Sequence, residues 1–445
     1  MIAVMILLGV IGVEVVLGIL SIKEKSPLYT LKANVRLAEF LLFILLVFTP
    51  LIKWNFRWYG LGFIFFIQAI IAVCRVLKSK KLPTITIGKT IAKIMLKSIL
   101  LIIMLIPALV FPQDSEIAPT GDYGVKTVTY TWTDESRDEA FTTEADYRNI
   151  TVQFWYPTKR KGSEEKAEGK FPLVIFSHGA FGIRASNTST YTELASHGYV
   201  VASIDHTYHA FFTKQTDGKV VLFNQGFMKE VNSLLIDEAG QMTQQKYNTI
   251  QSWLKLRTDD MIFCLNQIKS LAELPSDKDE VFNMIDIDNI GLMGHSLGGA
   301  TAATLGRQVE GIKAVAVIDG TMLGEEIGLK DGKEQVTTEP YPVPILNFYN
   351  GDSYEAIKEI KDIYPNTIAS ASQKNAYQIA IMNAGHMNFT DLPMVSPMLA
   401  KALGTGSVNP KACMKYVNQT ILEFFDGYLK GQSVNLSKEE VITIK

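Results

Sequence analysis

Cysteine, histidine and net charge are all scarce in this chain. Its 445 residues include 3 cysteines and 6 histidines, and the formal net charge is −2. A near-neutral chain has no broad basic field, which argues against nucleic acid as a partner. Cys74, Cys264 and Cys413 show no metal-ligand spacing, and we expect neither a metal nor an organic cofactor. Because Cys74 lies in an apolar run, the one possible disulfide joins Cys264 to Cys413, and two buried thiols are the favoured alternative.

Long apolar runs, by contrast, fill the beginning of the chain. They cover about residues 2–20, 37–52, 58–74 and 94–111, and each is near the length that crosses a hydrocarbon core of roughly 30 Å. Core helices of a soluble domain would not need such runs in succession. A cleaved signal peptide does not fit, because no basic segment precedes Ile2 and further apolar runs follow. We therefore predict a transmembrane region of about four helices over 1–112, a linker over 113–122 and a second domain over 123–445.

The basic residues predict which way this region crosses the membrane. The joint after the second apolar run has only Lys53 and Arg57, and the fourth run exits into Asp114 and Glu116. The basic residues in and around the first and third joints are Lys23, Lys25, Lys32, Arg36, Arg75, Lys78, Lys80, Lys81, Lys89 and Lys93. Short basic loops stay in the cytoplasm. We therefore expect a multi-pass protein of the cell membrane with its second domain on the extracellular side.

Beyond residue 113 the polarity is mixed, and short apolar runs alternate with helical stretches. Two segments, 124–132 and 149–156, have the Val, Thr, Tyr and Trp content of antiparallel strands. The later apolar runs are 173–177, 199–204, 290–293, 312–318, 345–349 and 377–382. Continuous apolar strands separated by helices predict a mostly parallel sheet with helices on both faces. In such sheets the working residues gather at the carboxyl ends of the strands.

One of these strand ends carries Gly294-His295-Ser296-Leu297-Gly298, and a helix of small residues follows. A Gly-x-Ser-x-Gly sequence between a strand and a helix is the nucleophile elbow, in which the serine sits on a strained turn. The later strand ends supply acids and then a histidine, which is the chain order that an α/β-hydrolase requires. The pattern therefore predicts an α/β-hydrolase fold with Ser296 as the nucleophile. A plain glycine-rich turn is the alternative.

A serine hydroxyl needs a base to take its proton and a carboxylate to orient that base. His386 is the only histidine after Ser296, and it follows the last of the predicted strands. Two strand ends offer the acid, since Asp319 and Asp352 each follow one. By position alone these aspartates are equal candidates. The one that is not the acid is expected to cap a helix or to accept a supporting hydrogen bond.

The oxyanion of a tetrahedral intermediate needs two backbone N–H donors. We expect one from Leu297, which follows the nucleophile. The other is expected from Ala180, in a loop after the strand 173–177 that is similar to the His-Gly motif of lipases and esterases. A glycine-rich turn without a catalytic part is the alternative for this loop.

A long insertion, residues 211–254, precedes the elbow strand and contains several phenylalanines. Insertions of this length are usually lids or acyl pockets, and ordinary surface helices are the alternative. Because 232–271 has a helical pattern, we assign the pocket to the aromatic part alone. Substrate contacts are expected from Phe181, His206, Phe211 and Phe212.

Several stretches together resemble the plasma-type platelet-activating factor acetylhydrolase family, which is related to dienelactone-hydrolase-like and polyester-degrading esterases. They are PLVIFSHG at 172–179, LASHGY at 194–199, WLKLR at 253–257, GHSLGGAT at 294–301 and HMNFTD at 386–391. The resemblance covers about 123–431. It implies that the acid follows the strand after the elbow helix, which favours Asp319, and its oxyanion donors fall on Ala180 and Leu297. The soluble members have no membrane region, and 211–254 does not match, so the reaction type transfers better than the substrate.

These features predict a membrane-anchored serine hydrolase of carboxylic esters that works through an acyl-serine intermediate. The resemblance implies short or oxidised acyl esters of phospholipids as substrates. A general carboxylesterase that acts on small or xenobiotic esters is the enzymatic alternative. A catalytically silent membrane protein that binds lipid is the alternative outside enzymes. The expected partners are the membrane and a lipid or small ester.

Overall fold

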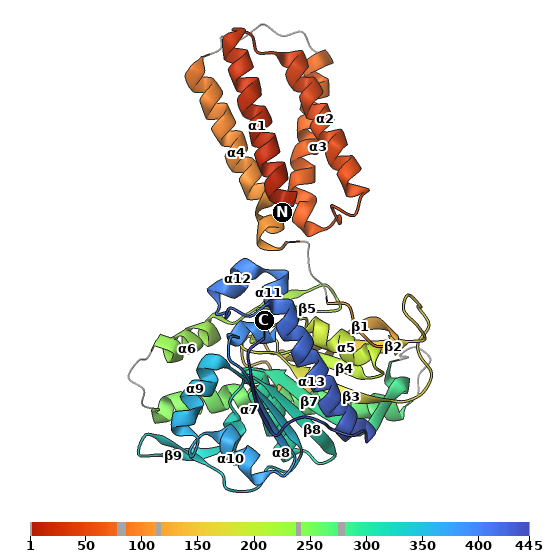
Figure 1. Ribbon diagram of the computed structural model, residues 1–445, viewed down its shortest axis with the longest axis vertical. Helices are drawn as coiled ribbons and strands as arrows, with labels where there is room; N and C mark the ends of the chain where they lie inside the picture. The colour runs from red at the N-terminus through yellow and green to blue at the C-terminus, as the bar shows by residue number, and fades with distance from the viewer. Residues whose placement is uncertain (1, 78–85, 113–116, 237–241, 275–280, 445) are drawn as a thin grey trace. The chain divides into compact units, whose positions relative to one another are not determined.

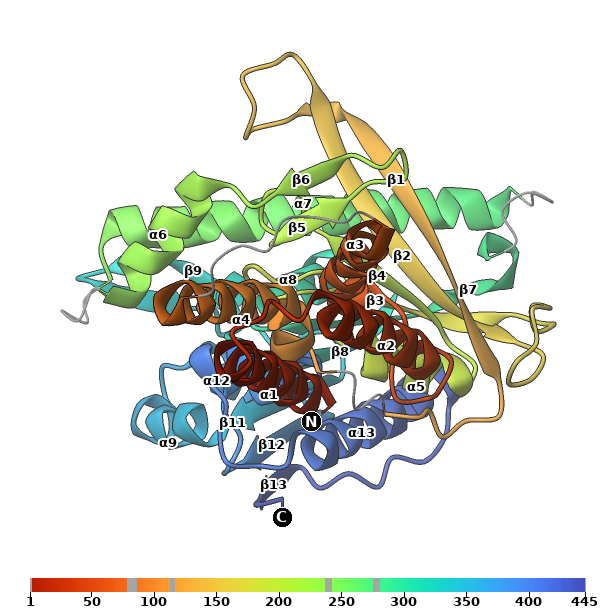
Figure 2. The same cartoon turned by 90° about the horizontal axis from the view of Figure 1, so that it is seen from above.

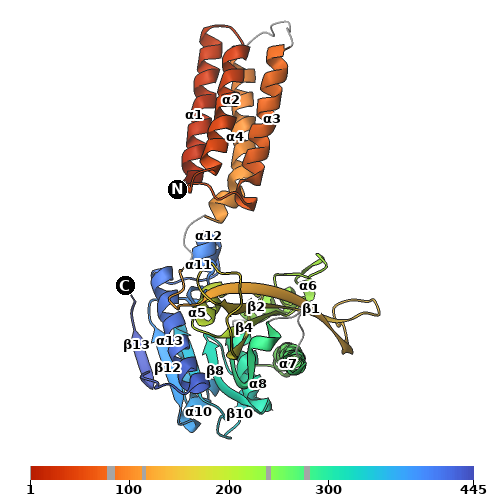
Figure 3. The ribbon, with the colours of Figure 1, turned by 90° about the vertical axis from the view of Figure 1, so that its right-hand side faces the viewer.

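The computed structural model describes residues 2–77, 86–112, 117–236, 242–274 and 281–444. The chain divides into two compact units, which are 1–115 with 394–401 and 116–393 with 402–445. Helices make up the first unit: α1 (Ile2–Lys23), α2 (Tyr29–Val47), α3 (Phe56–Leu77) and α4 (Ile87–Val110). They lie side by side in Figures 1 and 3. Each predicted apolar run therefore lies largely within a helix.

By length and composition, α1, α3 and α4 can cross a membrane, and α2 does not meet the same requirement. The prediction of four spanning helices is therefore wrong for α2. The physical reason is charge, because this helix of 19 residues includes Lys32, Arg36 and Glu39. Each ionised group at the centre of a bilayer costs about 2.5–3.5 kcal/mol on insertion scales.

Part of the charge inside this helical unit is neutralised by contacts between helices. Arg36 forms ion pairs with Glu14 of α1 and with Glu39 of its own helix. Lys97 of α4 reaches the same Glu14 carboxylate at 3.0 Å. Paired charges between helices lower the cost of placing them in an apolar surrounding. These contacts also join α1, α2 and α4 at one level.

The second unit is built on a nine-stranded sheet in the order β1-β2-β4-β3-β7-β8-β11-β12-β13. Strands β1 and β2 pair antiparallel along one edge, and β2 pairs antiparallel with β4 (Figure 2). The pairs from β4 through β3, β7, β8, β11 and β12 to β13 are all parallel. The strands are β1 (Gly124–Asp138), β2 (Tyr147–Thr158), β3 (Phe171–Ser177), β4 (Val200–Asp205), β7 (Ile285–His295), β8 (Ile312–Ile318), β11 (Ile345–Asn350), β12 (Ala376–Ile381) and β13 (Glu439–Ile442). The predicted mostly parallel sheet is confirmed.

Helices cover both faces of this sheet, and alternate residues of its strands form two separate cores. In β3, Leu173 and Ile175 belong to the core beneath α7 (Gln244–Glu273), α8 (Leu297–Gln308) and α10 (Pro365–Ser372). Val174 and Phe176 belong to the opposite core, beneath α5 (Thr188–Ser196) and α13 (Pro410–Lys430). Every residue of β3 is buried, as expected for a strand that is covered on both faces. The buried free thiols Cys264 and Cys413 lie in different cores.

The described residues between β4 and β7 include a small hairpin and two α-helices. The hairpin pairs β5 (Phe212–Lys214) with β6 (Val220–Leu222), and α6 (Gln225–Ile236) follows. The remaining elements are β9 (Glu326–Lys330) paired with β10 (Lys333–Val336), α9 (Gly351–Ile360), α11 (Leu392–Val395) and α12 (Pro397–Ala402).

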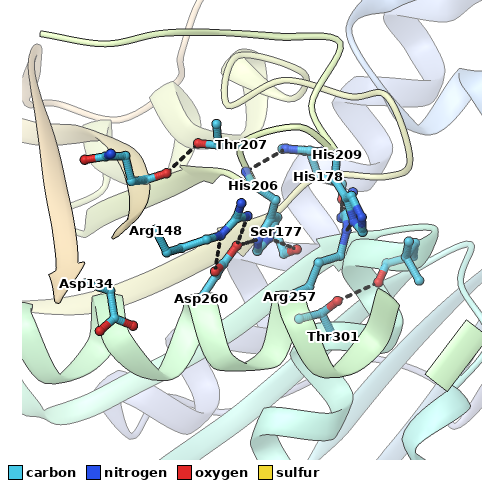
Figure 4. A network of polar contacts seen from close by, with 12 residues as sticks. Asp134, Arg148, Ser177, His178, His206, Thr207, His209, Arg257, Asp260 and Thr301 are labelled. Carbon is cyan, nitrogen blue, oxygen red and sulfur yellow. Dashed lines mark hydrogen bonds and ion pairs between the residues drawn. The ribbon is translucent and has the colours of Figure 1, made fainter. Parts of the chain in front are cut away.

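A buried cluster of charges links α7 to the β1–β2 edge of the sheet. Asp260 of α7 receives Arg148 Nη2 at 2.8 Å and Arg137 Nη2 at 3.0 Å, and Glu139 receives Arg148 Nη1 at 3.0 Å. Figure 4 shows Arg148 against Asp260. Burial raises the pKa of Asp260, but Arg148 and His206 outweigh burial and hold that pKa well below its usual range. These ion pairs therefore hold the β1–β2 edge against α7 only while Asp260 is ionised.

Replacing Asp260 by asparagine should lower the free energy of unfolding by about 3–5 kcal/mol, because two arginines lose the anion that compensates their burial. The neighbouring Asp259→Asn is the matched control. Asp259 forms an exposed ion pair with Lys255 on the same helix, and such pairs contribute about 0.3–0.5 kcal/mol. Urea unfolding of the detergent-solubilised chain at pH 7 measures both values. Equal effects of the two substitutions would contradict this account of the cluster.

Candidate active site

Ser296 lies between the last residue of β7 and the first residue of α8, in a strained conformation. Its φ is 54° and its ψ is −126°, a region that residues with a Cβ rarely adopt. The neighbouring glycines make the turn possible. A Cβ at Gly294 would lie 2.1 Å from Gly298 O, and a Cβ at Gly298 would lie 2.0 Å from Ser177 O. The turn therefore places Ser296 beyond the end of β7, where the backbones of strand and helix are in direct contact.

Asp319 and His386 lie together at the carboxyl ends of β8 and β12. Asp319 Oδ2 is 2.6 Å from His386 Nδ1. The same carboxylate accepts the Asn350 N–H at 2.8 Å and the Asn350 side-chain amide at 2.7 Å. Burial raises the pKa of Asp319, but the hydrogen bonds from His386 and Asn350 outweigh burial and keep the pKa below its usual value. Asp319 is thus an ionised acceptor for one ring nitrogen of His386.

The other candidate acid, Asp352, is exposed in the first turn of α9. There its charge favours the helix N-terminus, while Asn350 caps the helix by accepting the Ser353 N–H at 3.0 Å. Sequence reasoning missed Asn350. It lies at a strand end just before Gly351-Asp352, which is the signal that could have marked it as a partner of the acid.

His386 is packed against a second histidine. The rings of His295 and His386 have centroids 4.5 Å apart, and His295 Nε2 lies 3.2 Å from His386 O. Burial, with the neighbouring His386, lowers the pKa of His295 to about 3, so His295 stays neutral. In the described part of the chain no hydrogen bond joins Ser296 to His386. In structures without substrate, the hydrogen bond between a catalytic serine and its histidine is often long, and it shortens when substrate binds.

Leu297 directly follows Ser296 in the chain, and Ala180 directly follows Gly179, which lies against Ser296. Leu297 is the first residue of α8, where backbone N–H groups have no partner within the helix. The loop that carries Ala180 approaches from β3, and a Cβ at Gly179 would lie 3.2 Å from Ser296 Cβ. Among the backbone hydrogen bonds of the described loops and turns, neither the Ala180 N–H nor the Leu297 N–H takes part. Both N–H groups are therefore available beside Ser296.

Aromatic side chains line the same loop. Phe181, in a left-handed conformation with φ 56°, has ring centroids 5.9 Å from Phe223 and 4.9 Å from Phe227. Phe211 stacks on Phe223 at 5.6 Å, and its N–H donates to Gly182 O at 3.1 Å. Phe211 is 52% exposed. Phe212 lies on the exposed face of β5, where it pairs with Leu222.

The expectation that His206 contacts substrate is wrong. His206 is fully buried beneath the site, and its ring nitrogens lie 2.8 Å from Ser177 Oγ and 3.0 Å from Asp260 Oδ2. Burial lowers the pKa of His206 to about 4 and outweighs the hydrogen bond to Asp260, which raises that pKa. It links the end of β3 to α7. The described residues contain no group of three or more His, Cys, Asp or Glu side chains placed to hold a metal.

The sequence is similar to those of known proteins. The family model described as platelet-activating factor acetylhydrolase, isoform II, matches residues 145–440. The chain is 25% identical over 271 residues to the platelet-activating factor acetylhydrolase of Canis lupus familiaris, covering 58% of this chain and 57% of that protein. It is 26% identical over 275 residues to the protein of that name from Cavia porcellus, covering 59% of each. The match thus spans less than two thirds of these relatives' length.

The fold also occurs among solved structures. A ferulic acid esterase from Streptomyces cinnamoneus superposes with a TM-score of 0.55 at 21% identity, covering 72% of this chain and 95% of that chain. At this identity the likeness shows the fold alone. The family model covers about two thirds of the chain and includes the carboxyl ends of β3, β7, β8, β11 and β12. The chain therefore belongs to the platelet-activating factor acetylhydrolase, isoform II, family, with an α/β-hydrolase fold.

Proposed function

We propose that this chain is a serine hydrolase of carboxylic esters that works through an acyl-serine intermediate. The observation that carries the proposal is the Asp319–His386 pair, 2.6 Å apart, beside the strained Ser296 turn. An acid that fixes Nδ1 leaves Nε2 of His386 free to take a proton, which is what a serine nucleophile requires. Family membership supports the same reaction.

The reaction proceeds in two halves. Ser296 Oγ attacks the ester carbonyl carbon while His386 Nε2 takes the hydroxyl proton, and the N–H groups of Ala180 and Leu297 hold the oxyanion. His386 then gives the proton to the leaving alcohol, and the acyl group stays on Ser296. Water, activated by His386, releases the acyl group as a carboxylic acid.

The proposed substrates are phospholipids with short or oxidised acyl chains. Support comes from the relatives, whose names state that they are acetylhydrolases of platelet-activating factor. The exposed Phe211 and the half-buried Phe181 beside the oxyanion loop offer apolar contact to an acyl or alkyl chain. The proposal commits to a lipid ester rather than a small or xenobiotic ester.

A panel of phosphatidylcholines with acetyl to palmitoyl groups at the second position, together with a water-soluble p-nitrophenyl ester, tests the substrate. We expect turnover to be highest for the short acyl chains and to fall by about 10⁴-fold or more in Ser296→Ala, which lacks the nucleophile. Preference for the p-nitrophenyl ester alone would favour a general carboxylesterase. No hydrolysis at all would favour a silent lipid-binding protein.

Asp319→Asn should reduce turnover on the order of 10⁴-fold, because the imidazole takes the wrong tautomer and its developing charge loses support. Asp352→Asn is the matched control and should change turnover less than about twofold, since Asp352 is exposed in the first turn of α9. Steady-state rates of both purified variants on one short-chain ester measure the difference. A crippled Asp352→Asn beside an active Asp319→Asn would overturn the acid assignment but not the reaction type.

We also propose that α1, α3 and α4 anchor the enzyme in the cell membrane with residues 123–445 as an extracellular catalytic domain. Support for the anchor comes from their length and composition, and support for the side comes from the basic residues of the joint before α4. An odd number of spans places the N-terminus of α1 and the exit of α4 on opposite sides. With the exit of α4 outside, the joint before α4, which Arg75 and Lys89 flank, lies inside. The joint with Lys23 and Lys25 then lies outside, because α2 does not cross.

A membrane-impermeant fluorophosphonate added to intact cells tests the side. Extracellular placement predicts labelling of Ser296 without opening the cells, and protease added outside should cut the chain after residue 112. A cytoplasmic marker enzyme of the serine hydrolase class serves as the control for leakage. Labelling that appears only after lysis would place the catalytic unit inside.

A further inference from the structure

The loop that carries Ala180 is backed by a fully buried arginine. Arg257 of α7 has no exposed surface. Its Nη1 donates to His178 O, its Nη2 donates to Gly179 O at 3.3 Å, and its Nε donates to His209 Nδ1 at 3.3 Å. Figure 4 shows Arg257 close to His178 and His209. Burial and the charge of Arg257 lower the pKa of both histidines, so all its acceptors are uncharged.

A buried cation without an anionic partner needs a physical explanation. Among the described ion pairs Arg257 has none, whereas the buried Arg148 pairs with Glu139 and Asp260. Burial lowers the pKa of Arg257 to about 9, so the guanidinium remains charged at neutral pH. Asp260 attracts this charge and raises the pKa of Arg257, but no described ion pair joins the two side chains. Burying a guanidinium that has no direct carboxylate partner costs several kcal/mol. The explanation lies in the two carbonyl groups that it holds.

Those carbonyl groups fix the orientation of the peptide that carries the Ala180 N–H. Gly179 O accepts from Arg257 Nη2, from His178 Nδ1 at 2.7 Å and from the Gly182 N–H at 3.0 Å. The C=O and N–H of a trans peptide point in opposite directions, and the described chain has no cis peptide. Because Arg257 donates to the carbonyl oxygen of this peptide, the Ala180 N–H on its opposite side points away from Arg257.

The tautomer of His178 agrees with this arrangement. Burial lowers the pKa of His178 well below its usual value, so its ring is neutral. Its Nε2 accepts the His206 N–H at 3.3 Å, which leaves Nδ1 as the nitrogen that carries the proton. Nδ1 therefore donates to Gly179 O. The peptide between Gly179 and Ala180 is held from behind by two side chains.

We propose that Arg257 is a positioning residue for ester hydrolysis. By holding the carbonyls of His178 and Gly179, it fixes the peptide plane from which Ala180 donates its N–H to the oxyanion. Its charge on the carbonyl side also polarises that peptide, which strengthens the N–H as a donor. The inference rests on the proposed function, because an oxyanion forms only if Ser296 attacks an ester.

Arg257→Met removes the donors with little loss of volume, and Arg257→Lys keeps the charge as a single point donor. We expect Arg257→Met to lower kcat by about 10²–10³-fold, as loss of an oxyanion donor does, and Arg257→Lys to lower it less. KM should change by less than about threefold, because the effect arises in the transition state. A trifluoromethyl ketone, which forms a tetrahedral oxyanion on serine, should lose affinity by the same factor as kcat. A non-reactive ether analogue of the substrate should bind as before.

The matched control is Arg307→Met. Arg307 also donates to backbone carbonyls, those of Glu339 at 3.1 Å and Pro340 at 3.4 Å, but it lies at the far end of α8 from Ser296. Its kcat and ketone affinity should stay within about twofold of wild type. The comparison of the two variants separates the loss of the hydrogen bonds to the oxyanion loop from the general effect of removing an arginine.

Folded variants decide the inference, with folding checked by thermal melting and gel filtration. A folded Arg257→Met with kcat and ketone affinity within about threefold of wild type, or with only KM raised, would overturn it. If Arg257→Met does not fold, the same two constants of Arg257→Lys decide. Failure of the proposed function looks different, because then the wild-type chain does not hydrolyse esters or Ser296→Ala remains active.

Discussion

The close backbone contact between β3, β7 and α8 is the constraint on which the site depends. A Cβ at Gly298 would overlap Ser177 O at 2.0 Å, and a Cβ at Gly320 would overlap Ser296 O at 2.3 Å. Only glycine fits at these positions without moving a backbone. The contact forces the positive φ of Ser296 and places the first N–H groups of α8 against the end of β3. Ser296 and the first N–H groups of α8 are thus positioned by backbone packing rather than by flexible side chains.

The electrostatics of the site follow from which groups remain charged after burial. Asp319 keeps its charge because His386 and Asn350 donate to it. His295 beside it stays neutral, since burial lowers its pKa to about 3. Behind the oxyanion loop, Arg257 is charged while its acceptors are neutral. The negative charge of Asp319 therefore lies next to His386, and the positive charge of Arg257 lies behind the loop where an oxyanion would form.

Much of the fold and of the candidate site could be predicted from sequence because local patterns determine them. Buried parallel strands are continuous apolar runs, as in β3, and the glycines around Ser296 require the strand-turn-helix elbow. The acid could not be chosen by position, because Asp319 and Asp352 both follow strands. What separates them is the contact of Asp319 with His386, 67 residues later in the chain, and sequence spacing carries no information on such contacts.

Long-range contacts also explain the corrections. His206 follows a strand end like the other site residues, but its ring turns inward to Ser177 and Asp260. Arg257 lies on a helix whose pattern predicts only a surface and a buried face, so its hold on the carbonyls of His178 and Gly179 became visible in the structure alone. The helix α2 begins at Tyr29, ahead of the apolar run predicted from residue 37, so it includes Lys32 and Arg36, which the sequence placed in a joint.

The central claim is that Ser296 is an activated nucleophile, and mass spectrometry after reaction with a fluorophosphonate measures this most directly. The account predicts one phosphonyl adduct per chain on the peptide that contains Ser296. The adduct should be absent from Ser296→Ala and should still form in Ser353→Ala, a change at a serine in the first turn of α9 whose N–H donates to the cap residue Asn350. A wild-type chain that stays unmodified, or an adduct that persists in Ser296→Ala, would contradict the account.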